Sequence, residues 1–230
     1  MTTRRNLCLT VFGMLAAIPA SRGLLAQQTD QDDQDSLQPR GAPTGRIGAA
    51  TRGMYPGAQG VTLDLVAPSR GVGLTSFDRP TLCYLLSGVT SAPLQLTIST
   101  RGQARPLVDL ELPRPVTRLG VVDLREHDAR LAAGLVYVWS VALRLDPKAP
   151  SHDLVASALI QYKPVGPALE KEVRDAPAEQ QPALFEQNGY WYDAVTLAVR
   201  NAPRDNASVL TALLRKAGLQ AETSAGGQTP

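Results

Sequence analysis

The sequence predicts an α+β protein in which an antiparallel β-sandwich, immunoglobulin-like in pattern, precedes a short C-terminal helical hairpin or bundle. Between Val61 and Tyr162, segments of alternating apolar residues recur about every ten positions, separated by Pro and Gly. Such alternation is typical of half-buried strands, and the short spacing favours an antiparallel sandwich over βαβ units. From Pro167 onward the apolar period becomes 3.6, which indicates helices.

The first 26 residues have the three parts of a secretory signal peptide. A basic start with Arg4 and Arg5 precedes an apolar run over residues 7–20 and a short region that ends at Ala26. The apolar run is shorter than the roughly 20 residues that span a bilayer, so we expect no stable membrane span after signal cleavage. Cleavage is predicted after Ala26, with Ala20 as the alternative. The Arg pair leaves general-secretory and twin-arginine export both open, and either route places the protein in the periplasm or outside the cell.

Removal of this segment changes the charge and the cysteine content. The first 26 residues hold three of the 23 Lys and Arg residues and no acid, so 20 basic residues face 21 acidic ones. A chain so close to neutral has no general electrostatic attraction for nucleic acid, and we expect no nucleic-acid partner. Cys8 leaves with the segment, and the remaining Cys83 cannot form an intramolecular disulfide.

Composition divides the rest of the chain. Residues 27–45 are acidic, rich in Gln and poor in apolar residues, which predicts a disordered leader. The sandwich is expected over residues 46–164, the helical region over 165–218, and a second disordered stretch over 219–230. The stretch "RGAPTGRIGAATRG" has no strand before it and no helix after it, as a phosphate-binding loop requires, so we expect an irregular arm on the domain surface.

The strands are predicted from their apolar alternation. The longest segment, "LVYVWSVALRL", places Tyr137 and Trp139 on one face with Leu135, Val141, Leu143 and Leu145, so that face is expected in the core. The other predicted strands are "VTLDLVA", "TLCYLLSGV", "LQLTIST", "LVDLELP" and "DLVASALIQY". Cys83 falls inside one of them and is predicted to be a buried thiol.

Four aromatic residues gather in "ALFEQNGYWYDAVTLAV", between two predicted helices: Phe185, Tyr190, Trp191 and Tyr192. Gly189 suits the left-handed position that ends the first helix, and Gly218 suits the end of the last one. Helical spacing puts Trp191 in the apolar stripe with Ala194, Val195 and Ala198. Tyr192 falls off this stripe and Tyr190 lies at its edge. These two tyrosines are therefore the predicted contacts for a partner or ligand, and Trp191→Ala is expected to destabilise the protein more than Tyr192→Ala.

Residues suited to catalysis or metal binding are few. The candidates for an enzyme are Asp123, Glu126, His127 and His152, which lie in charged segments between strands. Glu126, His127 and Asp128 are adjacent in a turn, and adjacent residues rarely converge on one ion. "SHD" contains the letters of a catalytic triad, but a triad is an arrangement in space that neighbouring residues cannot form. We therefore predict no catalytic, cofactor-binding or metal-binding residue.

Several motifs in order resemble an uncharacterised bacterial family, the domain-of-unknown-function family nine-two-eight. They are "RGAPTGRIGAATRG", "DRPTLCYLLSG", "GLVYVWSVALRLDP", "QNGYWYDAVTLA" and "LLRKAGL", and they extend from Arg40 to Leu219. The family pattern often has a cysteine before the acidic-Pro turn, where this chain reads "LRLDP". The resemblance supports an exported domain and implies no reaction or ligand.

The segment "ALFEQNGYWYDAVTLAV" is also similar to one tetratricopeptide-type helical hairpin. Such repeats stack, and one hairpin cannot bury its faces alone. We therefore expect the sandwich to cover it.

The sequence thus favours an exported, non-catalytic interaction or scaffold component of the cell envelope, with another envelope protein as its partner. The alternative is a small-ligand or glycan-binding module that uses Tyr190 and Tyr192. An enzyme is the third hypothesis, and the oligomeric state is left open.

Overall fold

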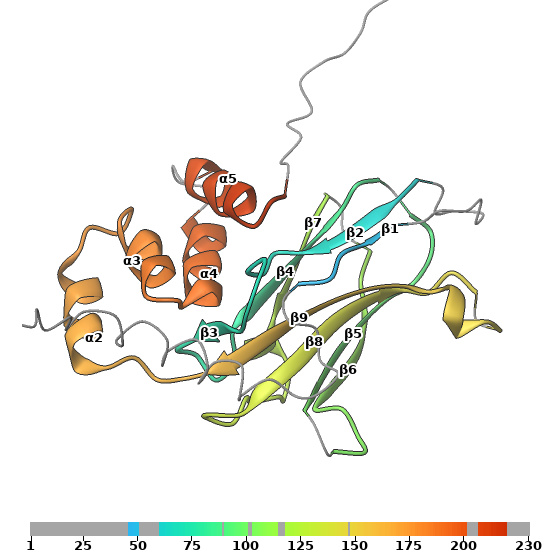
Figure 1. Cartoon of the computed structure of the whole chain (residues 1–230), viewed down its shortest axis with the longest axis horizontal. Coiled ribbons are helices and arrows are strands. Elements are labelled where there is room, and N and C mark those ends of the chain that lie inside the picture. The colour runs from blue at the N-terminus through green and yellow to red at the C-terminus, as the bar shows by residue number, and fades with distance from the viewer. Residues whose placement is uncertain are drawn as a thin grey trace, which may run out of the picture.

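The computed structural model describes residues 46–50, 60–88, 90–100, 103–114, 118–146, 148–201 and 207–219. The expected signal peptide, the leader over residues 27–45, and all of the C-terminal stretch except Leu219 lie outside these ranges. Within them the protein is α+β, with two β-sheets followed by C-terminal helices (Figure 1). The α+β prediction and the predicted helices are thereby confirmed.

The first sheet has four antiparallel strands in the order β1-β2-β4-β7. Its buried side alternates along β4 with Leu82, Tyr84 and Leu86, which pair across the ladder with buried residues of β2 and β7. Gly120 lies opposite Tyr84, and a Cβ there would come within 2.0 Å of the tyrosine ring. The strands are β1 (Ala49–Ala50), β2 (Thr62–Leu65), β4 (Thr81–Leu86) and β7 (Leu119–Asp123).

The second sheet has five strands in the order β3-β9-β8-β5-β6. The pairing of β3 with β9 is parallel, which corrects the expectation of a purely antiparallel arrangement; the other pairings are antiparallel. Residues of β3 and β7 were missing from the predicted strands, because three or five residues give too little alternation to recognise. The strands are β3 (Gly73–Thr75), β5 (Leu94–Thr100), β6 (Val108–Leu112), β8 (Val136–Leu143) and β9 (Leu154–Tyr162).

The predicted core face of β8 is confirmed inside the strand. Tyr137, Trp139, Val141 and Leu143 are buried, and they share one hydrophobic cluster with residues of the four-stranded sheet and of the helices. Leu135, by contrast, is exposed because it precedes the strand.

An N-terminal arm, residues 46–50, joins the two sheets. The backbone of Ile47 exchanges two hydrogen bonds with Ser157 at the edge of β9, at 2.8 and 3.0 Å. Two residues later, Ala49 pairs with Leu63 of β2 in the other sheet. The prediction of an irregular surface arm is therefore corrected for these residues, since this arm supplies strand pairing to both sheets.

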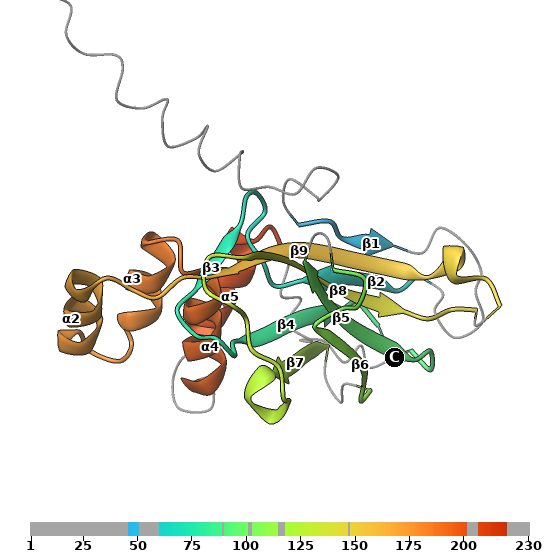
Figure 2. The same ribbon diagram turned by 90° about the horizontal axis from the view of Figure 1, so that it is seen from below.

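Four helices follow β9, and α4 is the one built into the sheets (Figures 1 and 2). It lies against β3 and β4, so the expectation that the sheets cover the helical hairpin is confirmed. The residue Gly189 before α4 and the residue Gly218 after α5 have φ of 80° and 70°, as expected for helix-ending glycines. The helices are α2 (Pro167–Asp175), α3 (Gln181–Gln187), α4 (Trp191–Asn201) and α5 (Ala207–Lys216). The short 3-10 turns are η1 (Leu124–Glu126) and η2 (Pro150–His152).

Candidate functional site

The aromatic segment lies at the junction between the helices and the sheets. All four rings are buried: Phe185, Tyr190, Trp191 and Tyr192. The expectation that Tyr192 lies off the core-facing stripe is wrong, because this side chain is 0% exposed whereas Trp191 is 7% exposed. The first turn of α4 is enclosed by β3, β4 and β9, so it has no solvent-facing side for Tyr192 to occupy.

Tyr192 fills a gap in the edge of β9. Its hydroxyl donates to the carbonyl oxygen of Leu159 at 2.9 Å and accepts from the indole Nε1 of Trp139 at 2.8 Å. The two rings meet edge to face, with centroids 6.2 Å apart. This position on β9 lies between the stretch paired with Ile47 and the stretch paired with β3, so a side chain completes the hydrogen bonding that a strand would otherwise supply. Burial raises the pKa of the Tyr192 hydroxyl, which therefore stays protonated and able to donate.

Tyr190 is also engaged within the molecule. Its hydroxyl donates to the carbonyl oxygen of Pro164 at 3.2 Å, and its ring packs edge to face on Phe185. Burial, with a smaller effect from the charge of Asp193, raises the pKa of its hydroxyl. Both tyrosines predicted to contact a partner or ligand are thus packed inside the protein.

Asp193 is a buried carboxylate that the sequence analysis did not single out. One carboxylate oxygen accepts from the Thr75 hydroxyl at 2.7 Å, and the other accepts from the backbone N–H of Ser76 at 2.8 Å. Burial raises the pKa of this carboxyl, although the hydrogen bonds from Ser76 and Thr75 oppose the shift. The carboxylate fastens α4 to the end of β3. Its helical position beside Trp191 and Tyr192 gave no sign of this role, because the partners come from a strand more than a hundred residues away.

A hollow of about 440 Å³ opens beside this junction. The loop between β2 and β3 forms one wall, the turn between α3 and α4 forms another, and Lys216 at the end of α5 contributes to the rim. The indole N–H of Trp191 donates to the carbonyl oxygen of Val66 at 3.2 Å, which holds the loop over the helix. The lining residues are Pro68, Ser69, Arg70, Gly71, Val72, Glu186, Gly189, Trp191 and Lys216.

The rim of the hollow carries charge. Lys216 is paired with Glu186 through its Nζ and a carboxylate oxygen. Arg70 is exposed and makes no hydrogen bond or ion pair within the described part of the chain. The hollow thus combines an apolar floor with two cations and one anion at its rim. It can accept a small ligand or an extended segment that carries negative charge.

A second surface lies on the outer face of the five-stranded sheet. Ile47 and Val155 are 51% and 44% exposed, and both lie on the side of β9 that faces away from the core. Small uncharged residues continue the face across β8 and β5: Ser157, Ser140, Ala142 and Thr97. We call this set, with Ile47 and Val155, the uncharged sheet face.

One border of the uncharged sheet face is a polar chain. Arg144 makes an ion pair with Asp153 at 2.7 Å and donates to the side-chain oxygen of Gln95. The amide of Gln95 donates in turn to Asp109 of β6. An uncharged centre beside a charged margin is the composition found where proteins associate, since charged residues are depleted from interface cores.

The residues considered for an enzyme do not come together. His127 follows η1, which precedes β8, whereas His152 belongs to η2, which follows β8, so the two histidines lie at opposite ends of that strand. Among the described residues no cluster of three His, Cys, Asp or Glu could hold a metal ion. Glu126 and Asp128 are exposed on the turn, and they do not converge with His127.

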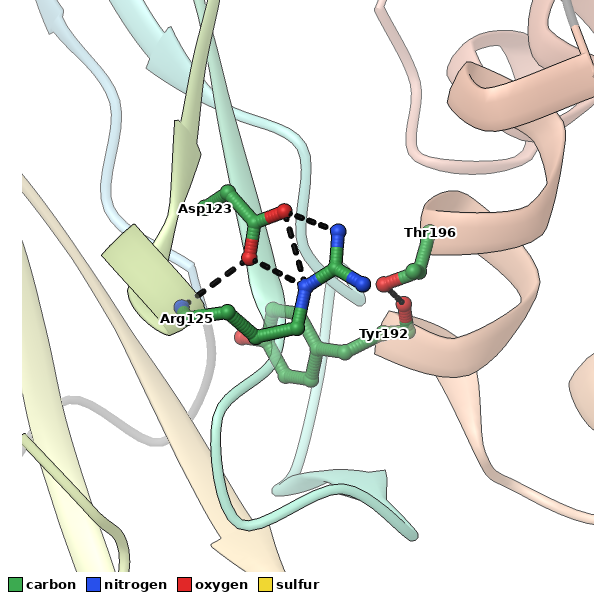
Figure 3. Close-up of polar contacts among 4 residues, drawn as sticks. All are labelled: Asp123, Arg125, Tyr192 and Thr196. Carbon is green, nitrogen blue, oxygen red and sulfur yellow. Dashed lines mark hydrogen bonds and ion pairs between the residues drawn. The ribbon is translucent and has the colours of Figure 1, made fainter. Parts of the chain in front are cut away.

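Asp123 is committed to a local ion pair. The Arg125 side chain folds back onto its carboxylate, which also accepts from the backbone N–H of Arg125 at 3.0 Å (Figure 3). These hydrogen bonds lower the pKa of the Asp123 carboxyl, and the charge of Arg200 contributes a smaller effect. In the same view Thr196 donates to the carbonyl oxygen of Tyr192, one helical turn earlier, at 2.7 Å. Asp123 therefore ends its strand and caps η1.

Cys83 is a free, buried cysteine, as predicted. Burial raises the pKa of its thiol to about 12, so the reactive thiolate is disfavoured. It lies on the β4 face away from the core of the two sheets, where α4 lies against the strand.

Comparison with known families gives one match. The model of the family described as Domain of Unknown Function (DUF928) matches residues 47–226. The chain belongs to this family. The match confirms the resemblance inferred from the five sequence motifs, and it includes the arm, both sheets and all the described helices. Neither the curated proteins nor the solved structures compared with the chain include a match.

Proposed function

We propose that the protein is exported and acts as a non-catalytic interaction or scaffold component of the cell envelope. The observation that carries this proposal is the uncharged sheet face, where Ile47 and Val155 expose about half of their side chains amid small residues. Burial of such side chains against a partner is favourable, at about 25 cal/mol per Å² of apolar surface. The proposed partner is another envelope protein that presents a complementary uncharged surface.

Export is supported by the three-part pattern of the first 26 residues. No helix among the described residues is long and apolar enough to cross a membrane. Cell fractionation and N-terminal sequencing test this part of the proposal. We expect a chain in the periplasm or medium that begins at Gln27, or at Ser21 if cleavage follows Ala20. A cytoplasmic chain that retains residues 1–26 would contradict export.

Site-specific photocrosslinking tests the partner surface in the native envelope. A photoreactive residue at Val155 is expected to give a defined adduct with one envelope protein, and the added substitution Thr97→Arg, which places charge on the same face, should abolish it. Val121 of β7 offers a matched control, because it is a strand valine of the other sheet with 47% exposure. The same products from both positions, or none from Val155, would remove the proposal.

We also propose that the two sheets pack as an immunoglobulin-like sandwich. In support, β9-β8-β5-β6 matches the G-F-C-C′ order of that fold, and β2-β4-β7 matches A-B-E. The Tyr137 hydroxyl, near the start of the strand equivalent to F, accepts from the backbone N–H of Ala132 at 3.1 Å, like the tyrosine corner of these domains. An experimental structure should place the mean strand directions of the two sheets within about 30°. A near-perpendicular crossing would refute the proposal.

A small-ligand or glycan-binding module is the second candidate function. The hollow favours it, because Trp191 supplies part of an aromatic floor and Arg70 is available at the rim. Titration with a panel of envelope glycans, followed by tryptophan fluorescence, should then reveal a ligand whose affinity falls at least tenfold in Arg70→Ala. No binding across the panel, or unchanged affinity in the variant, would exclude this candidate.

A further inference from the structure

The charges at the rim of the hollow are not balanced. Arg70 and Lys216 are both exposed, and Glu186 is the acidic residue of the lining. Glu186 already pairs with Lys216, whereas Arg70 has no partner within the described residues. An acidic segment that entered the hollow would therefore find one unpaired guanidinium and one ammonium shared with a single carboxylate. Arg guanidinium groups bind carboxylates through two parallel hydrogen bonds, so Arg70 is the stronger anchor.

The start of the described chain lies next to this rim. The guanidinium of Arg46 donates to the carbonyl oxygen of Ala217 at 2.8 Å and to that of Leu65 at 3.1 Å. Ala217 follows Lys216 directly. Because Arg46 is fixed at the end of α5, the residues that precede it join the structure beside the hollow.

Those preceding residues carry a dense acidic run. Asp30, Asp32, Asp33 and Asp35 fall within six positions, and the intervening residues are Gln. Asp35 is eleven residues before Arg46, a stretch that can span up to about 36–40 Å when extended. This reach is ample for a site that begins next to the anchor of the arm. A tethered segment meets its site at an effective concentration near millimolar, so individually weak, solvent-exposed ion pairs can hold it.

We propose that the acidic run of residues 30–35 docks in the hollow of its own chain, with carboxylates on Arg70 and Lys216. Docking pairs the free guanidinium and neutralises the excess positive charge of the rim. It also closes the hollow to other anionic ligands until they displace the segment. The hollow is then an autoinhibited site, and this inference is independent of export and of the uncharged sheet face.

A zero-length carbodiimide cross-linker tests the docking, since it joins a carboxylate only to an amine that it touches. The full-length chain as isolated is treated at low salt and analysed by mass spectrometry. We expect cross-links from Lys216 to the acidic run, alongside the Lys216–Glu186 cross-link that serves as an internal reference. In a mixture of light and heavy isotope-labelled protein, the products should be light–light and heavy–heavy. Salt at 0.5 M should suppress them, because the Debye length is then only a few ångströms.

Variants separate specific docking from general attraction. Arg70→Gln should lower the yield of leader cross-links at least threefold, relative to the Lys216–Glu186 reference. The matched control is Arg105→Gln, which removes an exposed arginine from the connection between β5 and β6 and should leave the yield unchanged. Cross-links of Lys216 to Glu186 alone would overturn the proposal. So would equal labelling of Lys163 and Lys171 by the acidic run, or exclusively light–heavy products, which would place the segment in another copy.

Discussion

The Tyr192 hydroxyl can be removed with little other change by Tyr192→Phe. In the wild-type protein this hydroxyl bridges the Trp139 indole and the Leu159 carbonyl, and both residues are at most 1% exposed. The substitution leaves one donor and one acceptor without partners and out of reach of water. A buried group left unsatisfied costs roughly 1–3 kcal/mol, and some relaxation is expected, so we predict a net loss of about 2–3 kcal/mol of unfolding free energy.

Urea denaturation measures this loss as a lower midpoint with an unchanged slope. For a domain of this size the melting temperature should fall by roughly 4–12 °C. Tyr162→Phe is the matched control, because Tyr162 is half-buried at the end of β9 and its hydroxyl makes no hydrogen bond to the described part of the chain. The control should stay within about 0.5 kcal/mol of wild type. Equal effects of the two substitutions would refute the proposed role of the hydroxyl bridge.

Three further predictions concern other parts of the fold. The pKa of Asp193 is raised, so its contribution to stability is present below about pH 4 and declines as pH rises through the folded-state pKa, whereas the lowered pKa of Asp123 gives a contribution that is present above about pH 4 and is lost as pH falls. The advantage of wild type over each Asp→Asn variant in urea unfolding should therefore decrease with pH for Asp193 and increase for Asp123; slopes of the same sign would contradict this assignment. Gly120→Ala should cost about 1–3 kcal/mol of unfolding free energy because the added Cβ meets a buried tyrosine ring, whereas Gly166→Ala, at an open site, should cost little in the same assay. Arg46→Lys keeps the charge but cannot bridge two carbonyls as the guanidinium does, so amide exchange in α5 should accelerate, and unchanged exchange would show that the bridge does not hold the helix.

Elements with a long periodic pattern were predictable from the sequence. The alternation in residues 135–145 predicted β8 and its buried face, and Gly189 and Gly218 predicted the ends of α3 and α5. These features depend on local periodicity and on backbone conformations that glycine adopts easily. The helices α2 to α5 were accessible for the same reason.

The surroundings of α4 were not predictable, because they depend on residues far along the chain. Helical periodicity assumes one wet face, and on that assumption Tyr192 belongs to the solvent side. In the structure the first turn of α4 is enclosed by strands from both sheets, so neighbouring positions are all buried. The same limit applies to the parallel partner of β3 and to the hollow, which brings together a loop, a turn and the end of α5.

The arm also has a consequence for the order of folding. Ile47 pairs with a strand 110 positions later, and Arg46 holds the end of the final helix, 171 positions later. Contacts of such sequence separation form slowly, because a long loop must close before they stabilise anything. A chain that emerges from a translocon N-terminus first would therefore keep the β9 edge open until its last helix has arrived. Closure of the arm would then be the final step of folding, and a chain truncated before α5 could not complete it.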